Sequence, residues 1–181
     1  MTAPFLTEAG IVALGYHHRP RITVIVGDNA GGKTTLLEAL RRHFGAADAR
    51  IHAATRMSPV ALRGTILERH GQTPVFLDDF GDSLDIRTIA AVCQVFRDYP
   101  YRETPVYLTT HAPYVLDMFT CESVCVIGRD DAGIHGVRMA DIIRREAPQL
   151  AHGCQTGEQW TTLDLPIERI RRCGALWLPA E

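Results

Sequence analysis

Three short polar segments carry side chains that could act together on a phosphate group. The first, 27-GDNAGGKT-34, fits the pattern G-x-x-x-x-G-K-[ST]. Glycines in such a loop let several backbone N–H groups point inward, and a helix that follows directs its positive end at the bound anion. The pattern predicts a loop that binds the phosphates of a nucleotide, and the alternative is a glycine-rich turn that matches by chance.

Each position of the predicted loop has an expected role. Lys33 would reach the β- and γ-phosphates, and the hydroxyl of Thr34 would bind Mg²⁺. We expect the other contacts with the nucleotide from the neighbouring positions Asp28, Asn29, Ala30, Gly31, Gly32 and Thr35. The loop pattern therefore predicts a nucleotide and Mg²⁺ as the ligands.

The second and third segments each follow an apolar run. In 75-VFLDDF-80, Asp78 lies where a carboxylate could hold Mg²⁺ through water, and Asp79 could position or deprotonate an attacking water. In 106-VYLTTHAPYVLD-117, His111 could contact a γ-phosphate. Either aspartate could instead cap the next element, and a histidine at a strand end is often structural, so the interpretation depends on the three segments together.

The elements that must position these residues follow from the periodicity of the apolar residues. Apolar runs predict strands at residues 21–26, 50–54, 74–77, 105–109 and 122–127, and a turn at 130–133 leads into an extended segment at 135–138. Helical spacing predicts helices at residues 34–44, 59–70, 86–99, 114–119, 140–146 and 167–172. This alternation predicts an α/β fold with a mainly parallel sheet covered by helices on both faces. The three polar segments would then meet at the carboxyl ends of the strands.

Length and composition favour one domain, residues 1–181. The chain is 46% apolar and 22% charged, and its net charge of -2 gives no overall basic field, so nucleic-acid binding stays uncertain. The basic clusters at 41–43, 144–145 and 169–172 are interpreted as solvated helix faces. No signal peptide is recognised, and no apolar run approaches the ~18 residues of a membrane span. Five cysteines without disulfide-like spacing favour a reduced, cytoplasmic protein with no membrane partner.

Taken in order, these residues resemble the ABC/SMC-like branch of P-loop ATPases, which includes RecF-like proteins and small ABC-type AAA ATPases. Residues 27–35 are similar to that branch's G-x-N-G-x-G-K-[ST]-[TN] loop, and Asp78-Asp79 falls at its Asp-Glu pair. Ser83-Leu84-Asp85 resembles its D-loop, and Thr110-His111-Ala112-Pro113 resembles its switch-histidine segment. Residues 124–130 are similar to the strand and hairpin that follow there. The resemblance covers about residues 20–140 and leaves 151–181 unassigned.

The resemblance implies a P-loop NTPase fold and Mg-dependent ATP hydrolysis that switches an association state. Lys33, Asp79 and His111 are its expected catalytic residues, and Thr34 and Asp78 its expected metal ligands. In this branch ATP lies between the phosphate loop of one subunit and the signature loop of another, which implies a homodimer or a hetero-partner. Small ATPases of this type resemble components that are paired with a nuclease or another DNA-processing protein.

Three departures from the branch's pattern keep other functions open. Ala30 stands where the family usually has glycine, and Asp79 replaces a glutamate that is one methylene longer, which predicts slow turnover. Near residues 56–61 the sequence reads RMSPVA in place of the signature loop, with only Ser58 in common, and the usual helical insertion is absent. One alternative is a non-catalytic, ATP-dependent interaction module. A small-molecule P-loop kinase is less favoured, because the Asp-Asp and Thr-Thr-His segments have no natural role in it.

Overall fold

The computed structural model describes residues 22–45, 50–68, 74–98, 104–112, 115, 119, 123–131, 133–146 and 175–179. Its strands are β1 (Ile22–Gly27), β2 (Ile51–Ala53), β3 (Val75–Asp78), β4 (Val106–Thr109), β5 (Val124–Asp130), β6 (Gly133–Arg138) and β7 (Ala175–Pro179). Its helices are α2 (Lys33–His43), α3 (Pro59–Glu68), α4 (Ile86–Asp98) and α6 (Met139–Glu146). Strands and helices alternate along the chain, so the predicted α/β class is confirmed.

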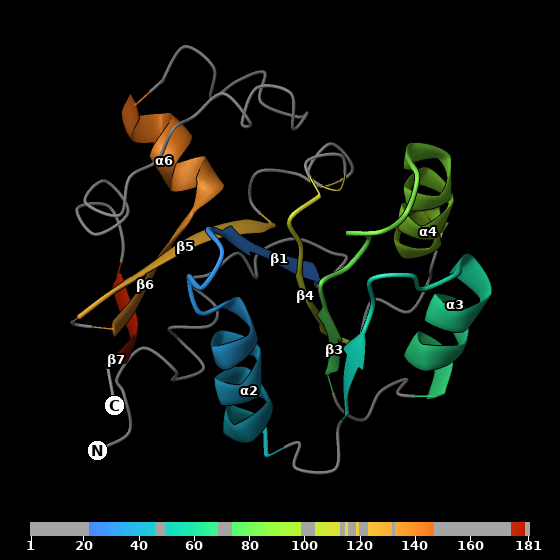
Figure 1. Ribbon diagram of the computed structural model, residues 1–181, viewed down its shortest axis with the longest axis horizontal. Helices are drawn as coiled ribbons and strands as arrows, with labels where there is room; N and C mark the ends of the chain where they lie inside the picture. The colour runs from blue at the N-terminus through green and yellow to red at the C-terminus, as the bar shows by residue number, and fades with distance from the viewer. Residues whose placement is uncertain are drawn as a thin grey trace.

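The described strands form one mixed sheet in the order β2-β3-β4-β1-β5-β6-β7 (Figure 1). The first five of these strands are parallel, and β6 and β7 extend the sheet in antiparallel pairing. The sequence did not predict β7, because residues 151–181 lack a clear apolar period. The helix predicted at 167–172 and most of the one predicted at 114–119 lie outside the described residues.

Helices pack on both faces of this sheet, with α2 on one side and α4 and α6 on the other (Figure 1). Successive side chains of a strand point to opposite faces, so Val24 and Ile25 of β1 enter two different apolar clusters. Leu36, Leu37 and Leu40 of α2 cover the cluster around Ile25. The larger cluster around Val24 takes side chains from α3, α4 and α6. This burial fixes β1, and with it the loop that follows.

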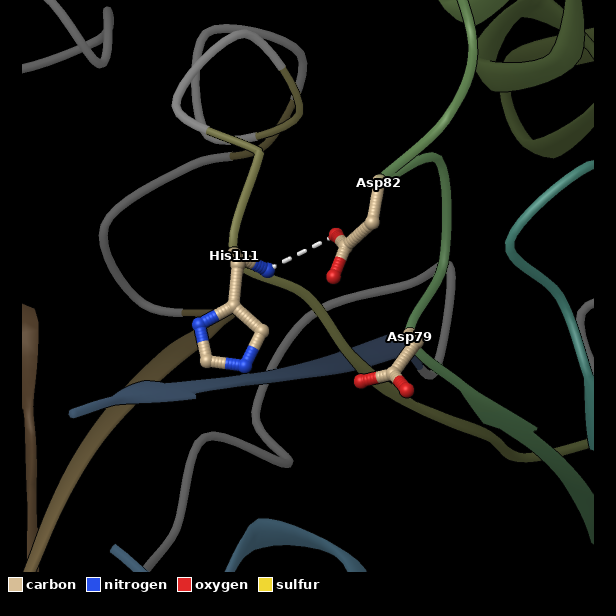
Figure 2. Close-up of side chains that lie close together, drawn as sticks. All are labelled: Asp79, Asp82 and His111. Carbon is tan, nitrogen blue, oxygen red and sulfur yellow. Dashed lines mark hydrogen bonds between the residues drawn. The ribbon is translucent and has the colours of Figure 1, made fainter. Parts of the chain in front are cut away.

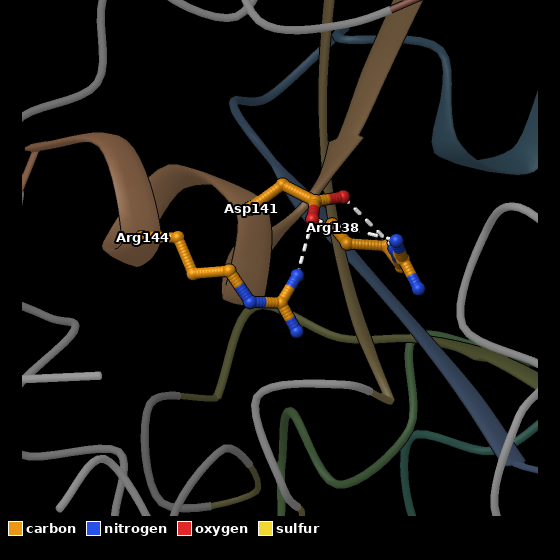
Figure 3. Close-up of polar contacts among 3 residues, drawn as sticks. All are labelled: Arg138, Asp141 and Arg144. Atoms are coloured by element: carbon orange, nitrogen blue, oxygen red, sulfur yellow. Dashed lines mark hydrogen bonds and ion pairs between the residues drawn. The ribbon is translucent and has the colours of Figure 1, made fainter. Parts of the chain in front are cut away.

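Two of the three predicted basic clusters lie on helices. Figure 3 shows Asp141, in the first turn of α6, between two arginines: Arg138 Nε and Arg144 Nη1 donate to its carboxylate at 2.9 and 2.6 Å. Arg41 of α2 likewise pairs with Glu38 one turn earlier, at 2.9 Å. Partly exposed pairs of this kind contribute about 0–1 kcal/mol each. They agree with solvated helix faces, while residues 169–172 lie outside the described part of the chain.

The helices of the described residues are also too short or too polar for a lipid bilayer: none meets the length and hydropathy that a membrane span requires.

Candidate functional site

The three polar segments meet at the edge of the sheet formed by the carboxyl ends of the parallel strands. Because β3, β4 and β1 are parallel neighbours, their carboxyl ends lie side by side. Backbone hydrogen bonds continue past the strands: Phe80 N–H donates to Thr109 O at 2.7 Å, and Thr110 N–H donates to Ile25 O at 3.2 Å. The predicted convergence of residues 27–34, 78–79 and 110–111 at this edge is therefore confirmed.

The backbone of the loop 27–34 turns through left-handed conformations. Gly32, the N-cap of α2, has φ 90°, and Ala30 has φ 63°. Ala30 thus adopts the conformation that glycine would take without strain, at a cost of roughly 1–2 kcal/mol. A Cβ on Gly27 would lie 2.3 Å from Ile127 O, so the neighbouring strand β5 requires glycine there. The loop keeps its turn although the sequence pattern departs from glycine at residue 30.

The start of α2 has free capacity to bind an anion. Among the described residues no side chain caps this helix end, and the first intrahelical bond is donated by Leu36 N–H to Gly32 O at 2.8 Å. The N–H groups of the first turn carry the positive end of the helix dipole. Together with the inward turn of the loop, this geometry suits phosphate oxygens.

Lys33 places its amine inside the loop. Its side chain is buried, and Nζ donates to Gly27 O at 2.9 Å and to Asp28 O at 2.8 Å. Burial lowers the pKa of this amine, while the carboxylates of Asp79 and Asp82 act in the opposite direction. Lys33 is also the single lysine of the whole chain. Among the described residues the hydrogen bonds of this cation go to neutral carbonyls, and the carboxylates act on it without a direct bond, so the amine can still pair with a bound anion.

Thr34 and Asp78, the two predicted metal ligands, are in direct contact. Thr34 Oγ1 donates to Asp78 Oδ2 at 2.9 Å, although 44 positions separate the two residues. The second carboxylate oxygen, Oδ1, accepts a 2.5 Å hydrogen bond from Thr109 Oγ1. A hydroxyl and a carboxylate are the oxygen donors that Mg²⁺ takes in proteins, so these residues fit that ion.

Asp79, which follows Asp78 in the chain, forms a cluster with Asp82 and His111 (Figure 2). One possible ligand atom from each of the three side chains lies within 4.8 Å of the others, and all three residues are exposed. Asp79 has φ 52°, and Thr109 Oγ1 accepts its backbone N–H at 2.9 Å. Although Asp79 is exposed, partial desolvation of its carboxyl group and the nearby carboxylates of Asp78 and Asp82 raise its pKa. Exposed acidic groups of this kind are common, so the cluster by itself does not indicate a metal.

Asp82 is a site residue that the sequence reasoning missed. Its Oδ1 accepts the backbone N–H of His111 at 2.9 Å (Figure 2). The neighbouring Thr110 Oγ1 donates to Phe80 O at 2.8 Å. These two bonds fasten the segment after β4 to the turn after β3. The signal available in the sequence was a third aspartate directly after Gly81. In the structure the φ of 78° at Gly81 marks a sharp turn there.

Two residues assigned from the resemblance act as helix caps. Ser58 Oγ accepts the N–H of Ala61 at 3.2 Å, which makes Ser58 the N-cap of α3. Asp85 caps α4 by accepting the N–H groups of Arg87 and Thr88 at 3.0 and 3.1 Å, and its hydrogen bonds with Thr88 lower its pKa. These caps account for both side chains structurally, and a contact of either residue with a second subunit stays a prediction.

Comparisons of the chain with protein-family models, with curated proteins and with solved structures found no match. The functional interpretation therefore depends on the geometry of the residues themselves.

Proposed function

We propose that this protein binds Mg-ATP and hydrolyses it, and that the nucleotide switches its association with a second copy or a partner. The observation that carries the proposal is the 2.9 Å hydrogen bond between Thr34 and Asp78. This contact places a hydroxyl and a carboxylate, the two groups proposed to bind Mg²⁺, together at the start of the helix that follows the glycine-rich loop. If residues 27–34 were only a glycine-rich turn that matches the pattern by chance, there would be no reason for Thr34 to contact Asp78.

Phosphate binding falls to the loop and to Lys33. The uncapped N–H groups at the start of α2 face the same anion as the lysine amine in this proposal. Nζ exchanges its bonds to Gly27 O and Asp28 O for bonds to β- and γ-phosphate oxygens. The desolvation that lowers the pKa of Lys33 is then offset by a direct charge pair.

Thr34 and Asp78 would hold Mg²⁺, directly or through water. When bound there, the ion would supply charge neutralisation to the phosphates. Thr109 supports this role, because its hydroxyl occupies one carboxylate oxygen of Asp78 and leaves the other turned to Thr34.

Asp79 and His111 are the proposed groups for the attacking water. The water oxygen bonds to the γ-phosphorus, its proton passes to the Asp79 carboxylate, and the bond to the β–γ bridging oxygen breaks to give ADP and phosphate. A raised pKa makes Asp79 a better proton acceptor than an ordinary aspartate. His111, held by Asp82, would contact a γ-phosphate oxygen.

A non-catalytic, ATP-dependent interaction module is the second candidate. It is favoured by the exposed position of Asp79, whose side chain is one methylene shorter than the glutamate that the family has there. It is also favoured by Ser58, the one residue in common with the signature loop, because its hydroxyl caps a helix. The two candidates share the binding site and differ only in turnover.

One experiment tests the proposal and separates these candidates. Wild type and the Asp79→Asn variant are run on size exclusion with light scattering, with and without Mg-ATP, and phosphate release is measured on the same samples. We expect both proteins to bind ATP and change their association state, with turnover only in wild type. Binding and association without turnover in either protein would favour the interaction module. Absence of ATP binding by wild type would refute both.

A further inference from the structure

A second concave feature adjoins the loop and has no role so far. A cleft of about 480 Å³ lies between residues 28–31 of the loop and residues 128–131 at the tip of the β5–β6 hairpin. We call it the hairpin cleft. Small-molecule sites in proteins have volumes of roughly 300–1,000 Å³, so it can hold part of a ligand. It shares the loop residues 28–31 with the proposed phosphate site.

The hairpin cleft lies where the strand order reverses. From β1 the chain crosses outward to β2 and returns through β3 and β4, and it then passes to the other side of β1 to form β5. The carboxyl ends of β1 and β5, which pair in parallel from Val24 to Gly27, therefore lead away in opposite directions. Open α/β sheets bind ligands at such a reversal, outside the carboxyl ends of the strands.

The charges of the hairpin cleft disfavour phosphate. Asp28, Asp130 and Asp131 bring three carboxylates to its lining, against one arginine, Arg129. Asp130 Oδ1 lies 3.1 Å from His135 Nε2 and its Oδ2 is buried, so this carboxylate adds negative charge to the lining, while the exposed carboxylates of Asp28 and Asp131 can accept hydrogen bonds from a ligand. Carboxylate oxygens repel phosphates but accept hydrogen bonds from hydroxyl and amino groups. The phosphate end of a ligand is thus directed to Lys33, and an uncharged end with hydrogen-bond donors to the hairpin cleft.

Arg129 supplies a flat cationic surface at this position. It is exposed, and among the described residues it forms no ion pair. Its Cδ lies 4.0 Å from the position that a Cβ on Gly32 would take, so the stem runs beside the start of α2. From there the guanidinium can lie flat against an aromatic ring, a stacking that the planar Arg group favours more than the compact ammonium of Lys.

From these observations we infer that the hairpin cleft holds the nucleoside end of the nucleotide, with the base against Arg129 and ribose or amino groups donating to the carboxylates of Asp28 and Asp131. The inference rests on the proposed function. It adds an orientation: the triphosphate runs from the β1–β5 side of the site toward Asp79 and His111, and the nucleoside lies over the hairpin.

The test compares two ligands that differ only in the nucleoside. Titration calorimetry measures the binding of Mg-ATP and of Mg-triphosphate to wild type, Arg129→Ala and Arg129→Lys. Arg42→Ala, which removes an exposed arginine from the far end of α2, is the charge-matched control. We expect Arg129→Ala to weaken ATP binding about tenfold and to leave triphosphate binding within the range of the control. Arg129→Lys, which keeps the charge, should also weaken the binding of ATP more than the binding of triphosphate.

The outcomes separate this inference from the proposed function. Equal weakening of ATP and triphosphate by Arg129→Ala would place Arg129 on the phosphates and overturn the inference. Unchanged binding of both ligands would overturn it as well, and in either case the proposed function would stand. If wild type binds neither ligand, the proposed function fails and the inference fails with it. Circular dichroism and the melting temperature show whether each variant is folded.

Discussion

Replacing Lys33 by methionine is expected to remove ATP binding and to leave the fold intact. The two side chains have similar length, and Lys33 is buried, so methionine fills the same space without the charge. The amine that is lost donates to Gly27 O and Asp28 O in the structure. Both carbonyls belong to the loop mouth, where water can replace the amine.

The magnitude follows from the bonds exchanged on binding. Two charge-assisted bonds to phosphate oxygens contribute about 1.5–3 kcal/mol each, and the two bonds to neutral carbonyls at 2.9 and 2.8 Å, worth about 0.5–1.5 kcal/mol each, are given up. The net loss of about 2–3 kcal/mol raises the Kd of ATP roughly 100-fold. The stability of the fold should change in the opposite direction. The pKa of Lys33 is lower in the folded protein than in the unfolded chain, so its buried charge destabilises the fold, and this cost is fully present at pH values below the lowered pKa. Methionine carries no such cost.

The single lysine makes the assay unusually direct. Lysine labelled with ¹³C at Cε gives one side-chain resonance, which is assigned to Lys33 without mutagenesis. Its titration should have a midpoint below the ordinary lysine value, and Mg-ATP should shift both the resonance and the midpoint, the latter upward because phosphate favours the cation. Calorimetry on Lys33→Met gives the affinity, and its melting curve gives the control for folding.

Two results would refute this reasoning. A lysine resonance that does not respond to saturating Mg-ATP would remove the amine from the nucleotide site. Retention of ATP affinity within a few-fold in a folded Lys33→Met variant would show that the loop does not bind phosphate through this residue.

Three further substitutions have defined outcomes. Asp79→Asn should keep ATP binding and reduce turnover by about 10²-fold or more, measured by phosphate release. The raised pKa of Asp79 means that its ionised form destabilises the folded protein, so the stability that Asp79→Asn gains over wild type should grow as the pH rises through that pKa, and equal stability profiles against pH would contradict this expectation. Gly27→Ala should cost about 3 kcal/mol, seen as a melting temperature roughly 6–12 °C lower, because its Cβ meets Ile127 O. Ala30→Gly should raise stability by about 0.5 kcal/mol through relief of the left-handed conformation, and a clear loss in denaturant unfolding would refute that strain.

The sequence by itself determined the elements and their order. Strands β1 to β5 and helices α2, α3, α4 and α6 begin and end close to the predicted residues, because apolar periodicity depends on contacts that neighbouring residues share. Continuous apolar strands also predicted a mainly parallel sheet, from which the meeting of the three polar segments at one edge follows. Ser58 as a helix cap was likewise a local property, readable from Ser-Pro before an apolar helix.

The tertiary structure alone decided which side chains touch. The contact of Thr34 with Asp78 depends on β1 and β3 lying on either side of β4, and strand order is not encoded in any local period. The hold of Asp82 on His111 and the left-handed backbone of Ala30 depend on the same long-range pairing. The hairpin cleft exists because β5 returns beside β1 and its hairpin reaches the loop. Sequence periodicity specifies which face of an element is buried, but the partner of each exposed polar group is fixed only when distant strands pair in register.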